Sequence, residues 1–313
     1  MATVVTKKKD LRLYPVFARH ETFHPRFGWL KKGFDKASRQ SDLFTDDLAP
    51  AILGVGKNMA KAIKYWCLAY KVLEEIQENG KGRILLLTDF GNKLLKDNGW
   101  DPYLEDHASL WLLHWNLLKL PNHATTWYYT FNVFNKHSFM AEDIQHGLME
   151  YIEREFPNKR ITESSVAKDV NCLLRMYVEG ASKQLTEDSI DSPFIDLGLI
   201  KRYGDRRHFA MNIGSKLGLA PEIIVASCLD FASTAEEGAK TISISRLTYE
   251  QGSPGQCFKL TEGLISEAIE LVAKDTEDIE LSETAGLVQM AFTEDPIAVA
   301  DKVLNKYYGK RRN

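Results

Sequence analysis

The feature that most constrains this fold is a lysine-striped segment, residues 57–74, whose apolar spacing predicts one amphipathic helix. At 100° per residue its lysines share a narrow arc, and the opposite side is apolar. The polar arc contains Lys57, Lys61, Lys64 and Lys71, with Asn58 beside the first lysine, and the apolar side contains Ile63, Trp66, Cys67 and Tyr70. One face of this helix is therefore expected to pack into a core while the other presents positive charge.

The segments on either side of this helix suggest a function for the charge. Residues 46–53 predict a short helix with acidic side chains in its first turn, and Gly54 and Gly56 break it. Residues 70–88 predict the end of the long helix followed by a strand-turn-strand hairpin. Helix, turn, basic helix and hairpin is the order of a winged helix-turn-helix, so the lysine arc and Asn58 are predicted to bind DNA. The alternative is a stripe of lysines that is only solvated.

Composition limits how DNA can be bound. The 313 residues, 44% hydrophobic and 27% charged, predict a soluble globular protein with room for two domains. The net charge of −3 argues against a protein that coats nucleic acid, so any DNA contact must come from local patches. All six tryptophans lie in the first 127 residues. We therefore predict a winged-helix-like DNA-binding domain with an N-terminal arm over residues 1–130, and a helical domain over 131–313 that has room for a second winged-helix unit.

The predicted fold class is mainly α with small β-hairpins, combining the winged helix-turn-helix unit with a helical C-terminal half. Further helices are expected within 101–156, 162–177, 220–233, 260–274 and 296–308, and a loop at 248–255. Residues 194–200 and 208–212 predict a second hairpin. Its tip is basic, with Lys201, Arg202, Arg206 and Arg207. A basic wing can hold a phosphate backbone, and the alternative is a solvated tip.

Residues 17–33 have the highest density of reactive side chains in the sequence. His20, Glu21 and His24 fit the zinc motif H-E-x-x-H. That motif needs a helix, and Pro25 disfavours the α conformation at His24, so no zinc enzyme is predicted. The alternative to a reactive role is that the aromatic residues of this segment anchor the arm while its charged residues are solvated or pair with each other. The four cysteines are far apart and no nucleotide-binding motif is present, so neither structural zinc nor a nucleotide cofactor is expected.

Targeting signals are not evident in the sequence. The lysines at 7–9 have no apolar segment behind them, so no signal peptide is predicted. No run of about 18 apolar residues occurs, so no membrane partner is expected and the predicted location is the cytoplasm.

Four short runs resemble a known family: Arg19-His20-Glu21-Thr22-Phe23, the run from Phe27 to Gly33, the run from Leu53 to Met59, and Leu87-Thr88-Asp89-Phe90-Gly91. They are similar to the SspB proteins, a bacterial family long catalogued as a domain of unknown function. Its members are encoded beside a cysteine desulfurase, an ATPase and a PAPS-reductase-like sulfur transferase. The family is regarded as the DNA-nicking component of a single-strand DNA phosphorothioation system used in phage defence. The resemblance therefore implies double-stranded DNA and these sulfur-transfer proteins as partners.

Two hypotheses follow from this resemblance. The first is a metal-dependent DNA nicking endonuclease, in which a divalent ion, Mg²⁺ or Mn²⁺, polarises the phosphate and the nearby side chains move protons. Its expected catalytic residues are Glu21, His20 and Arg26. The second is a non-catalytic, sequence-reading DNA-binding adaptor for the sulfur-transfer partners. The residues alone contain no carboxylate set with a recognised nuclease spacing, so both remain open.

Overall fold

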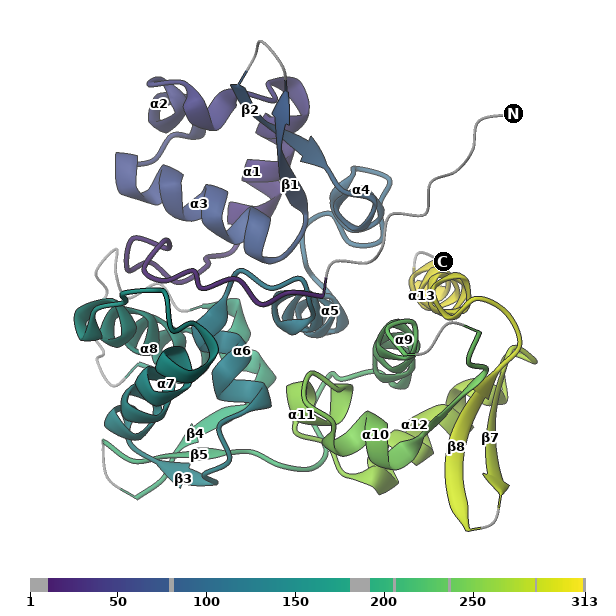
Figure 1. Cartoon of the computed structure of the whole chain (residues 1–313). Helices are drawn as coiled ribbons and strands as arrows, with labels where there is room; N and C mark the ends of the chain where they lie inside the picture. The colour runs from purple at the N-terminus through teal and green to yellow at the C-terminus, as the bar shows by residue number, and fades with distance from the viewer. Residues whose placement is uncertain are drawn as a thin grey trace.

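The computed structural model describes residues 11–78, 82–180, 192–204, 207–235, 238–284 and 286–311, and these are mostly helical (Figure 1). The helices are α1 (Trp29–Arg39), α2 (Ala49–Leu53), α3 (Lys57–Ala69), α4 (Asp89–Leu95), α5 (His107–Leu118), α6 (Thr125–Asn132), α7 (Ala141–Glu155), α8 (Glu163–Tyr177), α9 (Pro221–Ala232), α10 (Ile244–Tyr249), α11 (Pro254–Phe258), α12 (Glu262–Ala273) and α13 (Pro296–Arg311). The strands are β1 (Leu73–Glu78), β2 (Gly82–Leu87), β3 (Ser138–Phe139), β4 (Ile200–Arg202), β5 (Phe209–Met211), β6 (Thr241–Ser243), β7 (Ile279–Thr284) and β8 (Leu287–Phe292). The predicted class, mainly α with small hairpins, is confirmed.

One order of elements, helices followed by a hairpin, recurs along the described chain. The first unit contains α1, α2, α3 and the antiparallel hairpin β1–β2. The second contains α6, β3, α7, α8 and the hairpin β4–β5, with strand order β3-β5-β4. The third contains α9, β6, α10, α12 and the hairpin β7–β8, with strand order β6-β8-β7. In the second and third units, the last strand of the hairpin therefore lies between the other two.

Helix α3 ends earlier than its lysine pattern predicts. It stops at Ala69, and the backbone of Lys71 adopts a left-handed φ of 58°. The N–H of Val72 then donates to the carbonyl of Cys67 (3.0 Å), which is the geometry of a helix C-terminus. Residues 73 and 74, predicted to be helical, are the start of β1. The prediction was wrong here because helical spacing alone does not show where the backbone reverses.

The C-terminal part differs from its prediction in three places. Residues 193–197 form a 3₁₀ helix where a strand was expected. The predicted loop at 248–255 contains the end of α10 and the start of α11, because the hydroxyl of Ser253 caps a helix that Pro254 begins. Residues 279–292 form a hairpin that was not predicted. Its buried face carries Ile279, Met290 and Phe292, the period of two that a strand requires.

A continuous apolar core joins the three units. Trp66, Trp111 and Trp127 are fully buried in it, and it extends from Trp29 to Tyr308. Burying an aromatic side chain contributes roughly 1.5–3 kcal/mol, so these rings fix the helices firmly against one another. The predicted boundary after residue 130 falls within α6. Division of the chain into domains stays a prediction.

Candidate DNA interface and arm

An extended arm, residues 11–28, runs between α3 of the first unit and α6 and α8 of the second (Figure 1). The N–H of Tyr14 donates to the carbonyl of Asn122 (2.8 Å), and the hydroxyl of Thr125 donates to the carbonyl of Tyr14 (2.6 Å). The Tyr14 ring stacks on His123 at 4.5 Å between centroids. These contacts fix the start of the arm against the α5–α6 connection and the first turn of α6.

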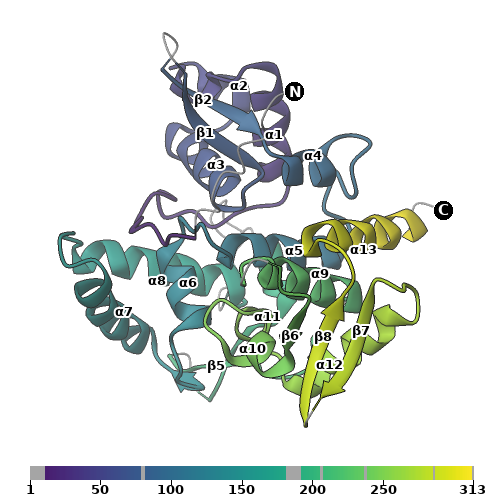
Figure 2. The same ribbon diagram turned by 45° about the vertical axis from the view of Figure 1, so that its right-hand side comes forward.

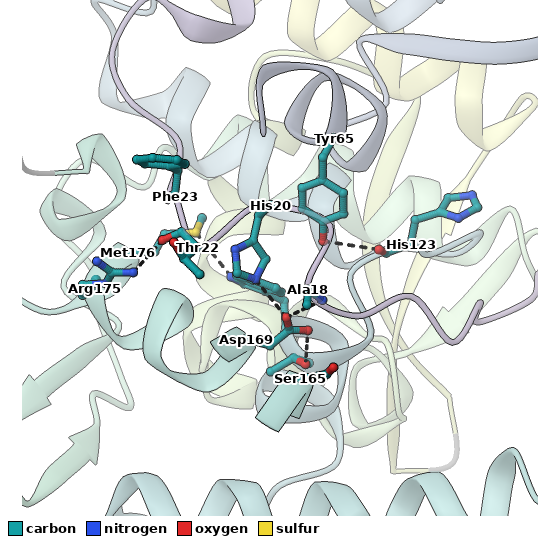
Figure 3. A network of polar contacts seen from close by, with 12 residues as sticks. Ala18, His20, Thr22, Phe23, Tyr65, His123, Ser165, Asp169, Arg175 and Met176 are labelled. Carbon is teal, nitrogen blue, oxygen red and sulfur yellow. Dashed lines mark hydrogen bonds and ion pairs between the residues drawn. The ribbon is translucent and has the colours of Figure 1, made fainter. Parts of the chain in front are cut away.

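A buried carboxylate, Asp169 of α8, anchors the arm (Figure 3). Its Oδ1 lies 2.8 Å from His20 Nε2 and accepts the backbone N–H of Ala18 at 2.7 Å. Its Oδ2 accepts the hydroxyl of Thr126 at 2.8 Å. His20 is fully buried, and its ring lies 5.6 Å from that of Trp127. Both groups are therefore inside the protein, where His20 holds the turn that contains Glu21.

The turn itself has an unusual backbone. Ala18, Glu21 and Thr22 have φ values of 55°, 48° and 68°, in the left-handed region that residues with a Cβ disfavour. Each such residue costs of order 1–3 kcal/mol, and it persists only where the surroundings hold it. Arg175 donates to the carbonyl of Thr22 (2.5 Å), shown in Figure 3, and the indole of Trp66 donates to that of Phe23 (3.0 Å). Residues 18–22 thus form turns and no helix, as Pro25 led us to expect.

Glu21 lies beside the basic end of α3. Its Oε1 is 3.2 Å from Lys61 Nζ, and these side chains are 33% and 53% exposed. Lys57 and Asn58 are exposed in the first turn of the same helix. Lys64 is already paired, with Glu75 of β1 at 2.5 Å. The structure therefore brings Glu21 and the start of the predicted lysine arc onto one exposed surface.

Lys71 does not lie on that surface. Because α3 ends at Ala69, the side chain turns inward, and its ammonium donates to the carbonyls of Asn116 and Lys119 at the end of α5. Burial lowers the pKa of Lys71 well below its usual value. This lysine instead satisfies carbonyls at the end of a helix.

The other predicted residues occupy two places. Arg26 stacks within the arm, with its guanidinium 5.7 Å from the Phe23 ring and 5.3 Å from that of Trp29. Lys201 and Arg202 lie on β4, and Arg207 lies in the turn before β5; all three are exposed. Arg206 is outside the described residues. Figure 1 places β4 and β5 at the end of the second unit opposite the arm, so these basic residues form a separate patch.

Comparison with known proteins places this architecture in a family. Residues 17–308 match the family described as "Protein of unknown function (DUF4007)". The solved "SspB crystal structure" is 37% identical with a TM-score of 0.90, covering 97% of this chain and 91% of that one. This chain belongs to the SspB family. A "Magnesium ion-bound SspB crystal structure" is 36% identical with a TM-score of 0.90, covering 98% of this chain and 92% of that one. No curated protein sequence matches.

The magnesium ion of that SspB structure raises the question of a metal site here. In the part of the chain that the structure describes, no three His, Cys, Asp or Glu side chains are grouped to hold a metal ion. Among these described residues, Glu21 and its neighbours therefore do not form a metal site by themselves. The same described residues contain no helix with the length and apolar character to cross a membrane.

Asp169, Thr126 and Arg175 are the site residues of this SspB protein that sequence reasoning missed. They lie far along the chain from the arm; His20 and Asp169 are 149 positions apart in the sequence. One signal was present. Asp169 falls in the apolar stripe of α8 together with Val166, Val170 and Leu173, all buried. A carboxylate on a buried helix face needs a hydrogen-bond or ionic partner, so this position in the sequence already indicates a buried polar contact.

Proposed function

We propose that this chain is a DNA-binding protein of the Ssp phosphorothioation system that nicks one strand so that sulfur can be incorporated. Membership of the SspB family supports the system. The single observation that carries the DNA role is the surface at the start of α3, where Lys57 and Asn58 are exposed and Lys61 lies 3.2 Å from the carboxylate of Glu21. Its partners are then double-stranded DNA and the sulfur-transfer proteins of the same system.

The repeated topology supports a winged-helix mode of binding. Each unit ends in a helix followed by a hairpin, and α3 precedes β1–β2 as a recognition helix precedes a wing. In the first unit, Lys57 and Lys61 would neutralise phosphates as the start of α3 approaches the groove. In the second unit, Lys201, Arg202 and Arg207 would hold the backbone from a wing. We propose the α3 surface as the main contact and the β4–β5 patch as a secondary one.

Glu21 is the proposed catalytic residue. Its carboxylate would take the proton of a water that attacks phosphorus, so that a P–O bond to water forms as the bond to the leaving oxygen breaks and that oxygen takes a proton from solvent. Lys61, 3.2 Å away, would offset the charge gained by the phosphate. His20 acts in this proposal as a positioning residue, because its ring is buried against Asp169. Arg26 stabilises the arm through its two aromatic contacts.

A non-catalytic adaptor is the second candidate, and one observation favours it. The carboxylate of Glu21 is paired with Lys61, as that of Glu75 is with Lys64, which is what a structural arm and hairpin need without any chemistry. The two functions share DNA binding and differ in strand cleavage.

DNA binding is tested with paired lysine variants. Lys57→Ala with Lys61→Ala should weaken duplex binding and reduce the slope of log K against log salt by about two units, one for each lost phosphate contact. The matched control is Lys302→Ala with Lys306→Ala, which removes the same charge from α13. The Lys302 side chain is 51% exposed and pairs with Glu294, much as Lys61 pairs with Glu21. If the two folded double variants show equal salt slopes, the α3 surface is excluded as the DNA contact.

A further inference from the structure

A cavity of about 160 Å³ opens where α4, α5, α9 and α13 lie side by side (Figures 1 and 2). Phe90, Trp100 and Trp115 supply aromatic walls, and neither the arm nor α3 contributes to the lining. The Trp100 ring is held flat against Tyr308, with centroids 5.3 Å apart and planes 7° apart. The cavity is therefore built by α9 of the third unit together with α4, α5 and α13, which lie outside the three units.

Charges in the lining are arranged with one carboxylate in excess. Lys93 pairs with Asp89 at 2.6 Å and with Asp301 at 2.7 Å, which links α4 to α13 across the cavity. Lys119 pairs with Asp230 at 2.7 Å. Three carboxylates thus face two ammonium groups, and the lining carries a net negative charge. A cation is favoured over a phosphate or another anion.

A buried acceptor in the same lining has no donor. Asn116 is 2% exposed, and its Nδ2 donates to the carbonyl of Leu112 at 2.9 Å. Its Oδ1 is buried without a hydrogen-bond partner among the described residues. A buried polar atom left in this state is unfavourable, so the cavity is suited to a ligand that brings N–H groups.

We propose that this cavity binds the guanidinium group of an arginine presented by a partner protein. A guanidinium is cationic, offers five N–H donors in a plane and stacks on aromatic faces, which matches the carboxylates, Asn116 and the indoles. The size of the cavity limits the ligand, because drug-sized molecules occupy roughly 300–1,000 Å³. About 160 Å³ holds a side-chain head and part of its stem. Useful affinity then needs contacts outside the cavity, which a protein surface provides and a small free ligand does not.

The test uses the whole chain and three small probes. N-acetyl-arginine amide should shift the indole N–H resonance of Trp115 saturably, since that group lies in the lining and donates to Asp230 at 2.8 Å. N-acetyl-citrulline amide has the same shape without the charge, and it should bind at least about tenfold more weakly. Equal binding of the two, or no saturable shift with either, overturns the proposal. Agmatine carries the same guanidinium group on a small free molecule. If agmatine binds about tenfold more tightly than the arginine amide, the proposal that the arginine comes from a partner protein is overturned.

Carboxylate variants locate the binding. Asp301→Asn keeps the shape of the side chain and removes one charge from the lining. It should therefore weaken binding of the arginine amide by about tenfold. Asp278→Asn is the matched control, because Asp278 pairs with Lys302 at 3.1 Å and does not line the cavity. Equal loss in both variants would place the probe elsewhere and reject the cavity. The comparison of arginine and citrulline on the unmodified protein decides the question even where a variant fails to fold.

Discussion

Removing the Asp169 carboxylate should release the arm. Asp169→Ala leaves three donors without their acceptor: the part-buried N–H of Ala18, and the buried hydroxyl of Thr126 and imidazole of His20. Each orphaned group costs about 1–3 kcal/mol, although some rotate or reach water. Allowing for that relief, we expect the three lost hydrogen bonds to lower the free energy of unfolding of Asp169→Ala by about 3–5 kcal/mol.

Urea unfolding followed by tryptophan fluorescence measures this loss, because Trp66 and Trp127 pack around His20. Hydrogen exchange of residues 18–23 should rise in the same variant, since the left-handed turn no longer has its anchor. Asp275→Ala, on the exposed ion pair with Lys310, is the control and should show no measurable loss. An Asp169→Ala protein within about 0.5 kcal/mol of the unmodified chain would refute the anchoring role of this carboxylate.

Two further predictions concern the core. Burial lowers the pKa of His114 to about 3 from 6.5, although its Nε2–H donates to the carbonyl of Cys257 and so opposes part of the shift. Between about pH 6.5 and pH 3 the unfolded chain therefore binds a proton at His114 that the folded chain does not bind. The free energy of unfolding should fall as the pH falls through that window, and it should fall less steeply in His114→Gln. Equal slopes of unfolding free energy against pH in the two proteins would contradict this. A β-carbon at Gly91 would overlap the carbonyl of Val72, so Gly91→Ala should lose about 1–3 kcal/mol. Gly263→Ala, in open space on α12, should be neutral or stabilised by up to about 1 kcal/mol, and thermal melts that rank the two variants the other way would count against this packing.

Local patterns predicted most helices because apolar spacing reflects which face is buried. The hydroxyl of Thr162 caps α8 where a helix start was predicted, and the hairpin after α3 forms close to its expected position. Features set by distant contacts were not predictable in this way. The backbone reversal at Lys71 and the hairpin at 279–292 depend on tertiary packing, which overrides local propensity.

The candidate site was predictable only in part, for the same physical reason. Glu21 and Lys61 were both nominated, yet nothing local showed that they meet across 40 residues. His20 was nominated as a reactive group, and the structure places it inside the protein on Asp169. Burial of a histidine depends on what the folded chain brings over it, so its residue type alone could not distinguish a reactive side chain from an anchor.

The most direct test of the account compares strand nicking with stability in one preparation of Glu21→Gln. This change keeps the size and hydrogen-bonding capacity of the side chain and removes the charge that the proposed proton transfer needs. Relaxation of supercoiled plasmid, with Mg²⁺ or Mn²⁺ present and absent, reports nicking, and a thermal melt reports folding. The account predicts a protein that melts like the unmodified chain, still binds duplex DNA, and nicks more slowly by orders of magnitude. A Glu21→Gln protein with an unchanged melt and an unchanged nicking rate would contradict it.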